Sequence, residues 1–126
     1  MPRILVTDDE DSMRSLVARA IATDGHEVLT ASDGGEALDL IVAEQGRFDL
    51  LLTDIKMPVM DGIALALAAA RDFPNLTILL MTGFADQRER ACGLDAIIHD
   101  VVTKPFSVAQ IRQAVREALS AGRKAA

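Results

Sequence analysis

The sequence predicts an α/β fold: five parallel strands in one sheet, doubly wound by helices that cover both faces. Short apolar runs rich in leucine and β-branched residues alternate along the chain with segments whose apolar residues recur at helical spacing. The apolar runs are continuous, which is typical of parallel strands that are buried on both faces. With 126 residues, the chain has the length of one such domain.

Five short segments have the composition of these strands, and most of them lead into polar residues. The first stops at acidic residues, the third is a leucine run that leads into Thr53 and Asp54, and the fourth is closed by Thr82 and Gly83. The predicted strands are Arg3–Thr7, Glu27–Ala31, Leu50–Asp54, Thr77–Met81 and Val101–Val102.

Four segments place apolar residues on one helical face and are bounded by capping or stop residues. Gly25 follows the first helix, and Pro74 ends the third. Ser107 is the predicted N-cap of the last helix, with Gln110 as its capping-box partner. The predicted helices are Asp11–Thr23, Gly35–Glu44, Ile63–Phe73 and Ser107–Leu119.

The stretch from Asp86 to Asp100 has a weaker pattern. Residues 87–90 indicate a polar, weakly amphipathic helix, and Leu94–Ile98 is compatible with either a helix or a strand. Seven residues follow Leu119. We therefore predict a single flavodoxin-like domain over residues 1–126, with a core at about residues 3–119, a tail at 120–126 and no output domain.

Composition narrows the classes of partner. The net charge is −6, and a surface of that sign repels phosphate backbones, so we expect no direct nucleic-acid partner. The single cysteine, Cys92, excludes an intrachain disulfide and fits a reducing compartment. The N-terminus lacks the shape of a signal peptide, and no apolar run approaches the roughly 18 residues of a membrane helix. These features predict a soluble, cytoplasmic protein without a membrane partner.

Four of the five predicted strands deliver a functional group at their carboxyl end. The first is followed by Asp8 and Asp9, the third ends in Asp54, the fourth is followed by Thr82, and the fifth leads to Lys104. Ligands of open α/β sheets bind outside the carboxyl ends of the strands. We therefore expect these side chains to form one site.

Three carboxylates at one edge require a counter-charge. Two of them about 5 Å apart repel by roughly 3 kcal/mol at an effective dielectric constant of about 20. Carboxylate oxygens suit a hard cation, and Mg²⁺ is commonly held by one or two carboxylates together with water and a phosphate. With a hydroxyl and an ammonium group beside them, these acids predict phosphoryl transfer to an aspartate.

Four motifs in this order resemble the signature of response-regulator receiver domains of the CheY-like type. They are ILVTDDE (residues 4–10), LLLTDIKMPVMDG (50–62), LLMTG (79–83) and VVTKPF (101–106), and the resemblance covers the chain from Arg3 to about Leu119. Each motif alone is weak evidence, but the ordered set at these spacings is specific.

The resemblance implies a role for each site residue. Asp54 is the phosphoacceptor, and it binds Mg²⁺ together with Asp9 and the backbone carbonyl of Lys56. Asp8 holds a water molecule on the metal. Thr82 moves toward the bound phosphoryl group, Lys104 pairs with it, and the Lys104–Pro105 peptide bond is expected to be cis.

The resemblance also implies the partners and the mode of action. A histidine kinase or a histidine phosphotransfer protein donates the phosphoryl group, and a downstream protein effector recognises the switched surface. The chain is expected to act in a two-component phosphorelay, and to catalyse only its own phosphorylation and dephosphorylation rather than the turnover of a separate substrate.

One position departs from the family pattern. Val101 stands three residues before Lys104, where receiver domains usually have Tyr or Phe as part of the output switch. An alternative route for the output is the loop from Gly83 to Arg90. That loop contains Phe84, and a bulky side chain there is expected to shield the acyl phosphate from water.

Two other classes of function stay open at this point. The first is a phosphorylation-independent interaction module with the same fold, which Val101 favours and the intact set of acids, Thr82 and Lys104 opposes. The second is a Mg²⁺-dependent phosphohydrolase with an aspartyl nucleophile. Haloacid-dehalogenase-like enzymes carry a second Asp two residues after the nucleophile, and here that position is Lys56.

Among receiver domains, the sequence also looks like the CpdR-like group, which adapts substrates to a bacterial protease. The shared features are the run from Thr82 to Ala85, Val101, and Ala125 with Ala126 at the end of the chain. This resemblance predicts an output in regulated proteolysis, with a protease adaptor target as the effector. The terminal alanines are either a degradation tag or simply part of an alanine-rich tail.

Several polar residues near the site have a structural interpretation. Asp61 and Gly62 are expected to form a turn and cap the helix that follows. Glu10 and Asp11 are expected to cap the first helix rather than bind metal.

Overall fold

The structure is a computed structural model that describes residues 2–83, 91 and 93–125. Its strands are β1 (Arg3–Thr7), β2 (Glu27–Ala31), β3 (Leu50–Asp54), β4 (Thr77–Thr82) and β5 (Asp100–Thr103). Its helices are α1 (Asp11–Ala22), α2 (Gly34–Ala43), α3 (Gly62–Asp72) and α5 (Val108–Ala125).

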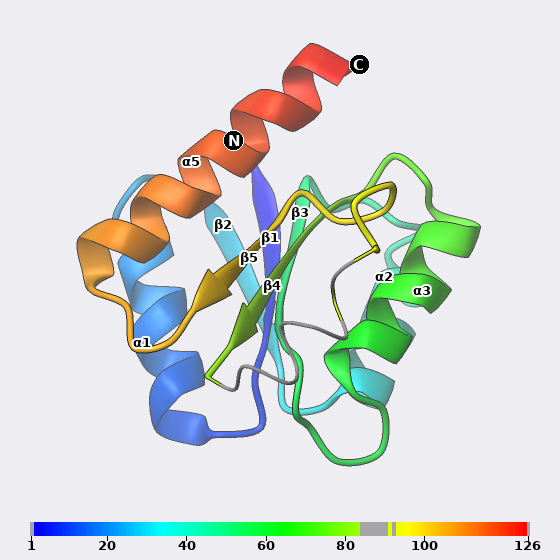
Figure 1. The fold of residues 1–126 in the computed structure, drawn as a ribbon, viewed down its shortest axis with the longest axis horizontal. Helices are drawn as coiled ribbons and strands as arrows, with labels where there is room; N and C mark the ends of the chain where they lie inside the picture. The colour runs from blue at the N-terminus through cyan, green and yellow to red at the C-terminus, as the bar shows by residue number, and fades with distance from the viewer. Residues whose placement is uncertain (1, 84–90, 92, 126) are drawn as a thin grey trace.

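All strand pairs are parallel, and the order across the sheet is β2-β1-β3-β4-β5. Helices α1 and α5 cover one face, and α2 and α3 cover the other (Figure 1). The chain therefore steps outward in both directions from β1 and β3, and the predicted doubly wound, CheY-like fold is confirmed. The carboxyl ends of the strands all lie at one edge, at the bottom of the sheet in Figure 1.

The core has two halves, one on each side of the sheet. Successive residues of the central strand β3 alternate between them, because neighbouring side chains of a strand point to opposite faces. Leu50 and Leu52 pack with α1 and α5, whereas Leu51 packs with α2 and α3, and all three leucines are fully buried. Burial on both faces explains why the strand sequences are apolar without interruption.

The predicted helix starts and strand positions agree with the structure to within about two residues, which is the usual scatter of element boundaries. The capping box of α5 is confirmed: Gln110 N–H donates to Ser107 Oγ (3.0 Å), and Ser107 N–H donates to Gln110 Oε1 (2.7 Å). The cap of α3 is confirmed as well, because Ala64 N–H donates to Asp61 Oδ1 (2.8 Å).

Two expectations about local structure were wrong. Helix α5 continues to Ala125 instead of ending at Leu119, because the alanine-rich segment holds no proline and Gly122 packs closely on Thr77 of β4. Residues 94–98 form neither a helix nor a strand but consecutive turns, in which Ile97 N–H and Ile98 N–H both donate to Leu94 O. The predicted helix at 87–90, Phe84, Cys92 and Ala126 lie outside the described residues.

At the start of α1, Glu10 occupies the N-cap position, but its side chain accepts no hydrogen bond from the helix backbone. It accepts a hydrogen bond from Ser12 Oγ instead (3.0 Å). The predicted cap is therefore right in position and wrong in its contact, because a glutamate side chain is too long to turn back onto the first amides as Asp or Ser does.

An ion pair ties the loop after α1 to α5 across the sequence. Arg112 donates two hydrogen bonds to the carboxylate of Asp24, and both side chains are partly buried. The hydrogen bond from Arg112 lowers the pKa of the Asp24 carboxyl below its ordinary value, against the opposing effect of burial.

Within the described part of the chain, no helix is both long and apolar enough to cross a membrane.

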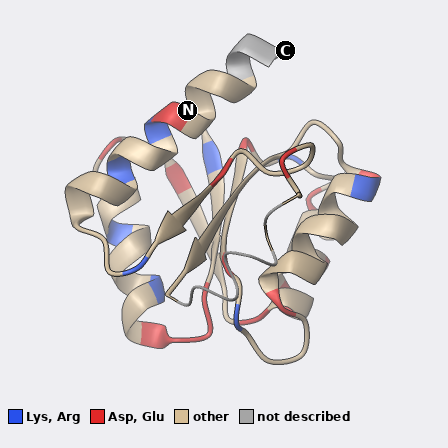
Figure 2. Ribbon diagram, viewed as in Figure 1, with Lys and Arg blue, Asp and Glu red and all other residues tan. Residues whose placement is uncertain are grey.

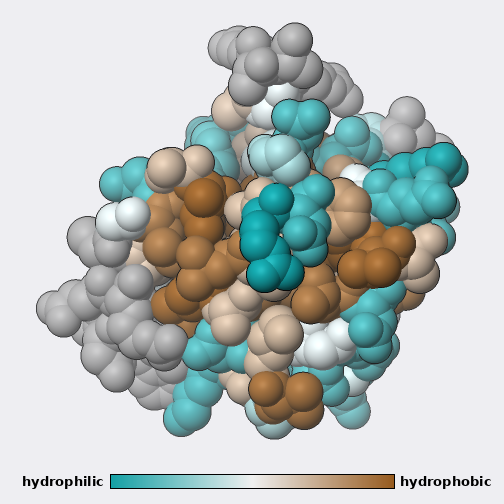
Figure 3. All heavy atoms as spheres, turned by 90° about the vertical axis from the view of Figure 1, so that its right-hand side faces the viewer, coloured by the Kyte–Doolittle hydropathy of each residue, from teal (hydrophilic) through white to brown (hydrophobic). Residues whose placement is uncertain are grey.

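The two core halves predict a large difference between two leucines. Leu52→Ala should lower the free energy of unfolding by about 2–5 kcal/mol, because it leaves a cavity at a fully buried position. Leu67 is 50% exposed on the face of α2 and α3, where Figure 3 shows apolar side chains at the surface. Leu67→Ala should change that free energy by less than about 0.5 kcal/mol. Urea denaturation followed by circular dichroism compares them, and equal losses would contradict the assigned core.

The pair of Arg112 and Asp24 predicts a pH dependence. A carboxyl whose pKa is lowered by folding stabilises the protein above its ordinary pKa, and this contribution disappears as the pH falls through the folded-state pKa. Arg112→Gln should therefore be less stable than the wild type at pH 7, and the difference should shrink below the ordinary Asp pKa of about 3.9. Arg71→Gln is the control, because Arg71 pairs at 3.2 Å with its exposed neighbour Asp72. A difference that does not vary with pH would exclude the ion pair as its cause.

Candidate functional site

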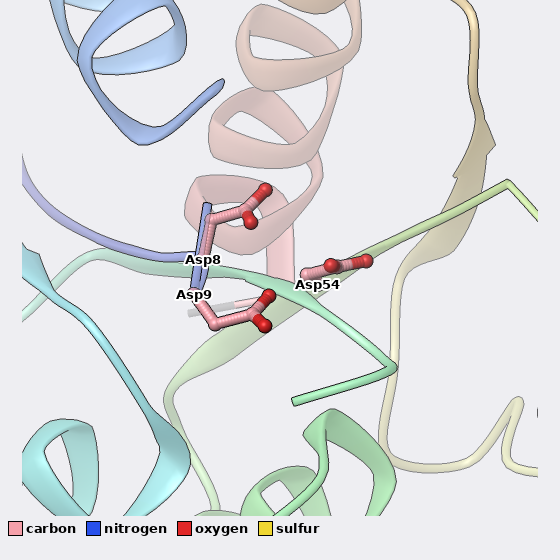
Figure 4. Close-up of side chains that lie close together, drawn as sticks. All are labelled: Asp8, Asp9 and Asp54. Atoms are coloured by element: carbon pink, nitrogen blue, oxygen red, sulfur yellow. The ribbon is translucent and has the colours of Figure 1, made fainter. Parts of the chain in front are cut away.

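Three acidic side chains meet at the carboxyl edge of β1 and β3. Asp8 is fully buried, Asp54 is 8% exposed, and Asp9 is exposed. One carboxylate oxygen of each lies within 4.8 Å of the others, and Figure 4 shows the three side chains close together. Figure 2 shows acidic residues in the segments that follow the strands at this edge. The predicted clustering of Asp8, Asp9 and Asp54 is therefore confirmed.

The parallel pairing of β1 with β3 brings these residues together. Thr7 is the register partner of Thr53, so the residues that follow the two strands are neighbours. Hydrogen bonds then hold Asp8: its Oδ1 accepts from Glu10 N–H (3.0 Å), and its carbonyl accepts from Arg14 Nη1 (2.9 Å). The turn into α1 is thus bonded to the same carboxylate that the site uses.

Asp54 is held by its own neighbours. Its Oδ1 accepts a hydrogen bond from Ile55 N–H (3.0 Å), and its carbonyl accepts one from the Thr53 hydroxyl (2.9 Å). Burial raises the pKa of the Asp54 carboxyl above its ordinary value; Lys104 opposes this, and the nearby Asp8 carboxylate adds to it. Burial therefore disfavours the ionised form of Asp54, which lowers the stability of the folded protein when this carboxyl is charged.

Lys104 reaches into the acidic cluster from the loop after β5. Its Nζ lies 3.3 Å from Asp8 Oδ2 and 3.4 Å from Asp54 Oδ1. Its backbone N–H donates to Thr82 O (2.7 Å), which joins it to the buried end of β4. The Lys104–Pro105 peptide bond is cis, as predicted. Lys104 and Asp8, both predicted from strand ends, thus meet across 96 residues of sequence separation.

Sequence reasoning missed part of the support for the site. The sequence places Thr53 only as the residue before Asp54, although its hydroxyl donates to the Asp54 carbonyl and lies 3.9 Å from Met57 Sδ. The Thr-Asp pair at the strand end is a signal that would have pointed to it. Lys56 is exposed two residues after Asp54, and its carbonyl as a metal ligand stays a prediction.

The donor set fits a magnesium ion. It is made of carboxylate oxygens only, which are the ligands that Mg²⁺ prefers over soft or nitrogen donors. Lys104 Nζ contacts two of the three carboxylates, and a cluster of ionised carboxylates at one edge attracts a divalent cation.

The comparisons with known proteins agree with this geometry. The family model described as the response regulator receiver domain matches residues 4–116, and the chain belongs to this family of signalling modules. It is 36% identical over 117 residues to the response regulator MprA of Mycolicibacterium vanbaalenii, with 93% of the chain and 50% of that protein covered. It is 35% identical over 124 residues to the probable transcriptional regulator ycf27 of Guillardia theta, with 98% and 48% covered. The chain thus spans about half the length of these curated relatives.

Solved structures of receiver domains share the fold over nearly the whole chain. A CheY-like receiver domain protein from Methanospirillum hungatei superposes with a TM-score of 0.89 at 28% identity, covering 100% of this chain and 99% of that one. The response regulator TrrA from Thermotoga maritima, solved in complex with Mg(2+)-BeF, gives a TM-score of 0.83 at 30% identity, covering 94% and 99%.

The acidic cluster predicts that Mg²⁺ stabilises the protein. At a free concentration 100 times the dissociation constant, the free energy of unfolding should rise by about 2.7 kcal/mol. Asp9→Asn should lose most of this gain at the same concentration, because it removes one carboxylate of the cluster at an exposed position without disturbing the core. Asp39→Asn, at an exposed position of α2, should keep it. Urea denaturation with and without MgCl₂ measures the gain, and an undiminished gain in Asp9→Asn would contradict the assigned cluster.

Proposed function

We propose that this chain is a Mg²⁺-dependent phosphorylation switch of a two-component phosphorelay, with Asp54 as the phosphoacceptor. The observation that carries the proposal is the position of Lys104 Nζ between the Asp8 and Asp54 carboxylates, at the strand edge where Asp9 also lies. An ion pair that served only stability would need one acid, whereas this lysine contacts two and the carboxylate of Asp9 lies within 4.8 Å of both.

The chemistry assigned to Asp54 is nucleophilic. A carboxylate oxygen forms a bond to phosphorus, while the bond from phosphorus to the leaving imidazole nitrogen of a phosphohistidine breaks, and its electron pair stays on that nitrogen. Bound Mg²⁺ would supply positive charge to the transferring oxygens. Asp8, Asp9, Asp54 and the Lys56 carbonyl are the groups that would hold it. The Mg(2+)-BeF complex of the Thermotoga relative supports this choice of metal.

Lys104 and Thr82 are assigned to the phosphoryl group after transfer. Lys104 already pairs with Asp54, so its ammonium group is within reach of new oxygens on that carboxylate. Thr82 ends β4 beside β3, and its hydroxyl is a donor of the right type for a phosphoryl oxygen. Both residues convert an event at Asp54 into new hydrogen bonds on β4 and β5.

The proposed donor is a histidine kinase or a histidine phosphotransfer protein, and the proposed readout is a changed surface for a downstream protein in the cytoplasm. Val101 is only partly buried in β5 and packs against the core half of α2 and α3. It lacks the aromatic ring by which receiver domains usually report the state of the Thr. An output in regulated proteolysis rests on the CpdR-like resemblance, and it stays a prediction, as does action without an output domain.

The test is covalent labelling. The wild type incubated with Mg²⁺ and acetyl phosphate should gain the mass of one phosphoryl group, measured on the intact protein. The gain should be absent in Asp54→Asn and after removal of Mg²⁺ with EDTA. Asp61→Asn is the control. Its side-chain oxygen can still accept the hydrogen bond from Ala64 N–H, so this variant should still be labelled. A wild type that gains no mass from acetyl phosphate or from a phosphorylated histidine donor would overturn the proposal in favour of a phosphorylation-independent module.

A further inference from the structure

The start of α2 lies directly against the segment that leads from the acceptor to α3. We call residues 55–61 the β3–α3 loop. Gly34 is the first residue of α2, and a Cβ atom built on it would lie 2.8 Å from Met60 Cβ and 2.9 Å from the Met60 carbonyl carbon, and closer still to the carbonyl oxygen. Atoms do not approach this closely, so any side chain at position 34 must displace the backbone of Met60.

The β3–α3 loop is strained at the residue before this contact. Val59 has φ +70°, and Met60 N–H donates to Pro58 O (2.8 Å) across it. This is a three-residue turn in its rare positive-φ form, with a β-branched residue where glycine or asparagine is expected. The Val59 side chain is 85% exposed, so burial of that side chain does not stabilise the conformation. Strain of this kind persists only where the surrounding structure holds it.

Both ends of the β3–α3 loop are held together next to Asp54. Gly62 N–H donates to Ile55 O (2.7 Å), and a Cβ atom on Gly62 would lie 2.9 Å from the Asp54 carbonyl carbon. Lys56 is inside this short closed loop. A shift of Met60 is therefore not absorbed by slack chain but passes through the strained turn toward Lys56 and Asp54.

We propose that Gly34 is a positioning residue for the metal site. Its lack of a side chain lets α2 seat the β3–α3 loop, and the seated loop sets the place of the Lys56 carbonyl relative to the Asp54 carboxylate. The inference rests on the proposed function, since it concerns the metal that Asp54 and Lys56 are proposed to bind. The three nearest atoms to a Cβ built on Gly34 all belong to Met60, so Gly34 acts through the position of Met60.

The neighbouring glycine provides a matched control. Gly35 also lies in the first turn of α2, so Gly34→Ala and Gly35→Ala raise helix propensity equally. A Cβ atom on Gly35 would meet only side-chain atoms, Val59 Cγ1 at 3.2 Å and Asp33 Oδ1 at 3.3 Å. The exposed Val59 side chain can move aside without a change of the backbone, whereas relief of the contact at Gly34 requires a shift of the Met60 backbone. The two variants therefore differ in whether the backbone of the loop is pushed.

The experiment measures Mg²⁺ affinity apart from phosphorylation. Isothermal titration of each protein with MgCl₂ should give a dissociation constant roughly tenfold weaker for Gly34→Ala than for the wild type, and unchanged for Gly35→Ala; supporting groups around metal ligands typically change affinity about 10–100-fold. With acetyl phosphate, Gly34→Ala should label more slowly at low Mg²⁺ and regain most of the wild-type rate at saturating Mg²⁺.

The outcomes separate the two proposals. A wild type that binds no Mg²⁺ overturns the proposed function and this inference together. A wild type that binds Mg²⁺ with the same affinity as Gly34→Ala overturns the inference alone, as does an equal weakening in Gly35→Ala. If Gly34→Ala does not fold in plain buffer, all three proteins are titrated in trimethylamine N-oxide, which favours the folded state. The Mg²⁺ dissociation constants of the three proteins are then compared in the same way.

Discussion

Repulsion among three carboxylates at the end of β1 and β3 is the constraint on which the rest of the site depends. Asp8 and Asp54 are buried beside one another, and Asp9 completes the cluster at the surface. Two such charges in a partly buried setting repel by several kcal/mol, so the native state needs a positive group at this edge. Lys104 supplies one charge, and its contacts with Asp8 and Asp54 draw the loop after β5 onto the strands at the centre of the sheet.

Apolar contacts along the strands, away from the carboxylates, hold these acids close together. Register between β1 and β3 is set by the packing of their buried side chains, because a slip of one residue would move every side chain into the core half that its neighbour fills. Once Thr7 is opposite Thr53, Asp8 and Asp54 have no freedom to separate. Apolar burial along β1 and β3 thus offsets the electrostatic cost at their ends, which is a common division of labour between a scaffold and a functional site.

The position of functional groups at the carboxyl ends of the strands explains why most of the site was predictable from the sequence. Other parts of the structure depend on contacts that the sequence does not reveal. Apolar runs define the strands, and parallel strands share one carboxyl edge, so Asp8, Asp9, Asp54 and Lys104 follow from the sequence. The turn at Val59 did not follow, because valine is disfavoured at positive φ and the close approach of Gly34 to Met60 exists only in the folded chain. The extension of α5 depends on packing of Gly122 against Thr77, which local composition does not reveal.

Lys104 also links the charge of the cluster to the edge of the sheet. In the proposed switch, conversion of the Asp54 carboxylate to an acyl phosphate would add negative charge and new acceptor oxygens at the carboxylate that Lys104 contacts. The backbone N–H of Lys104 is bonded to Thr82 O, so a shift of this lysine acts on the ends of β4 and β5 together. Because β5 is an edge strand with α5 behind it, the response reaches a surface that a partner protein can contact. The small side chain of Val101 leaves this backbone hydrogen bond intact. The absence of the usual aromatic ring therefore removes one side chain that responds to the state of the site, but it keeps the backbone connection from Lys104 to β4.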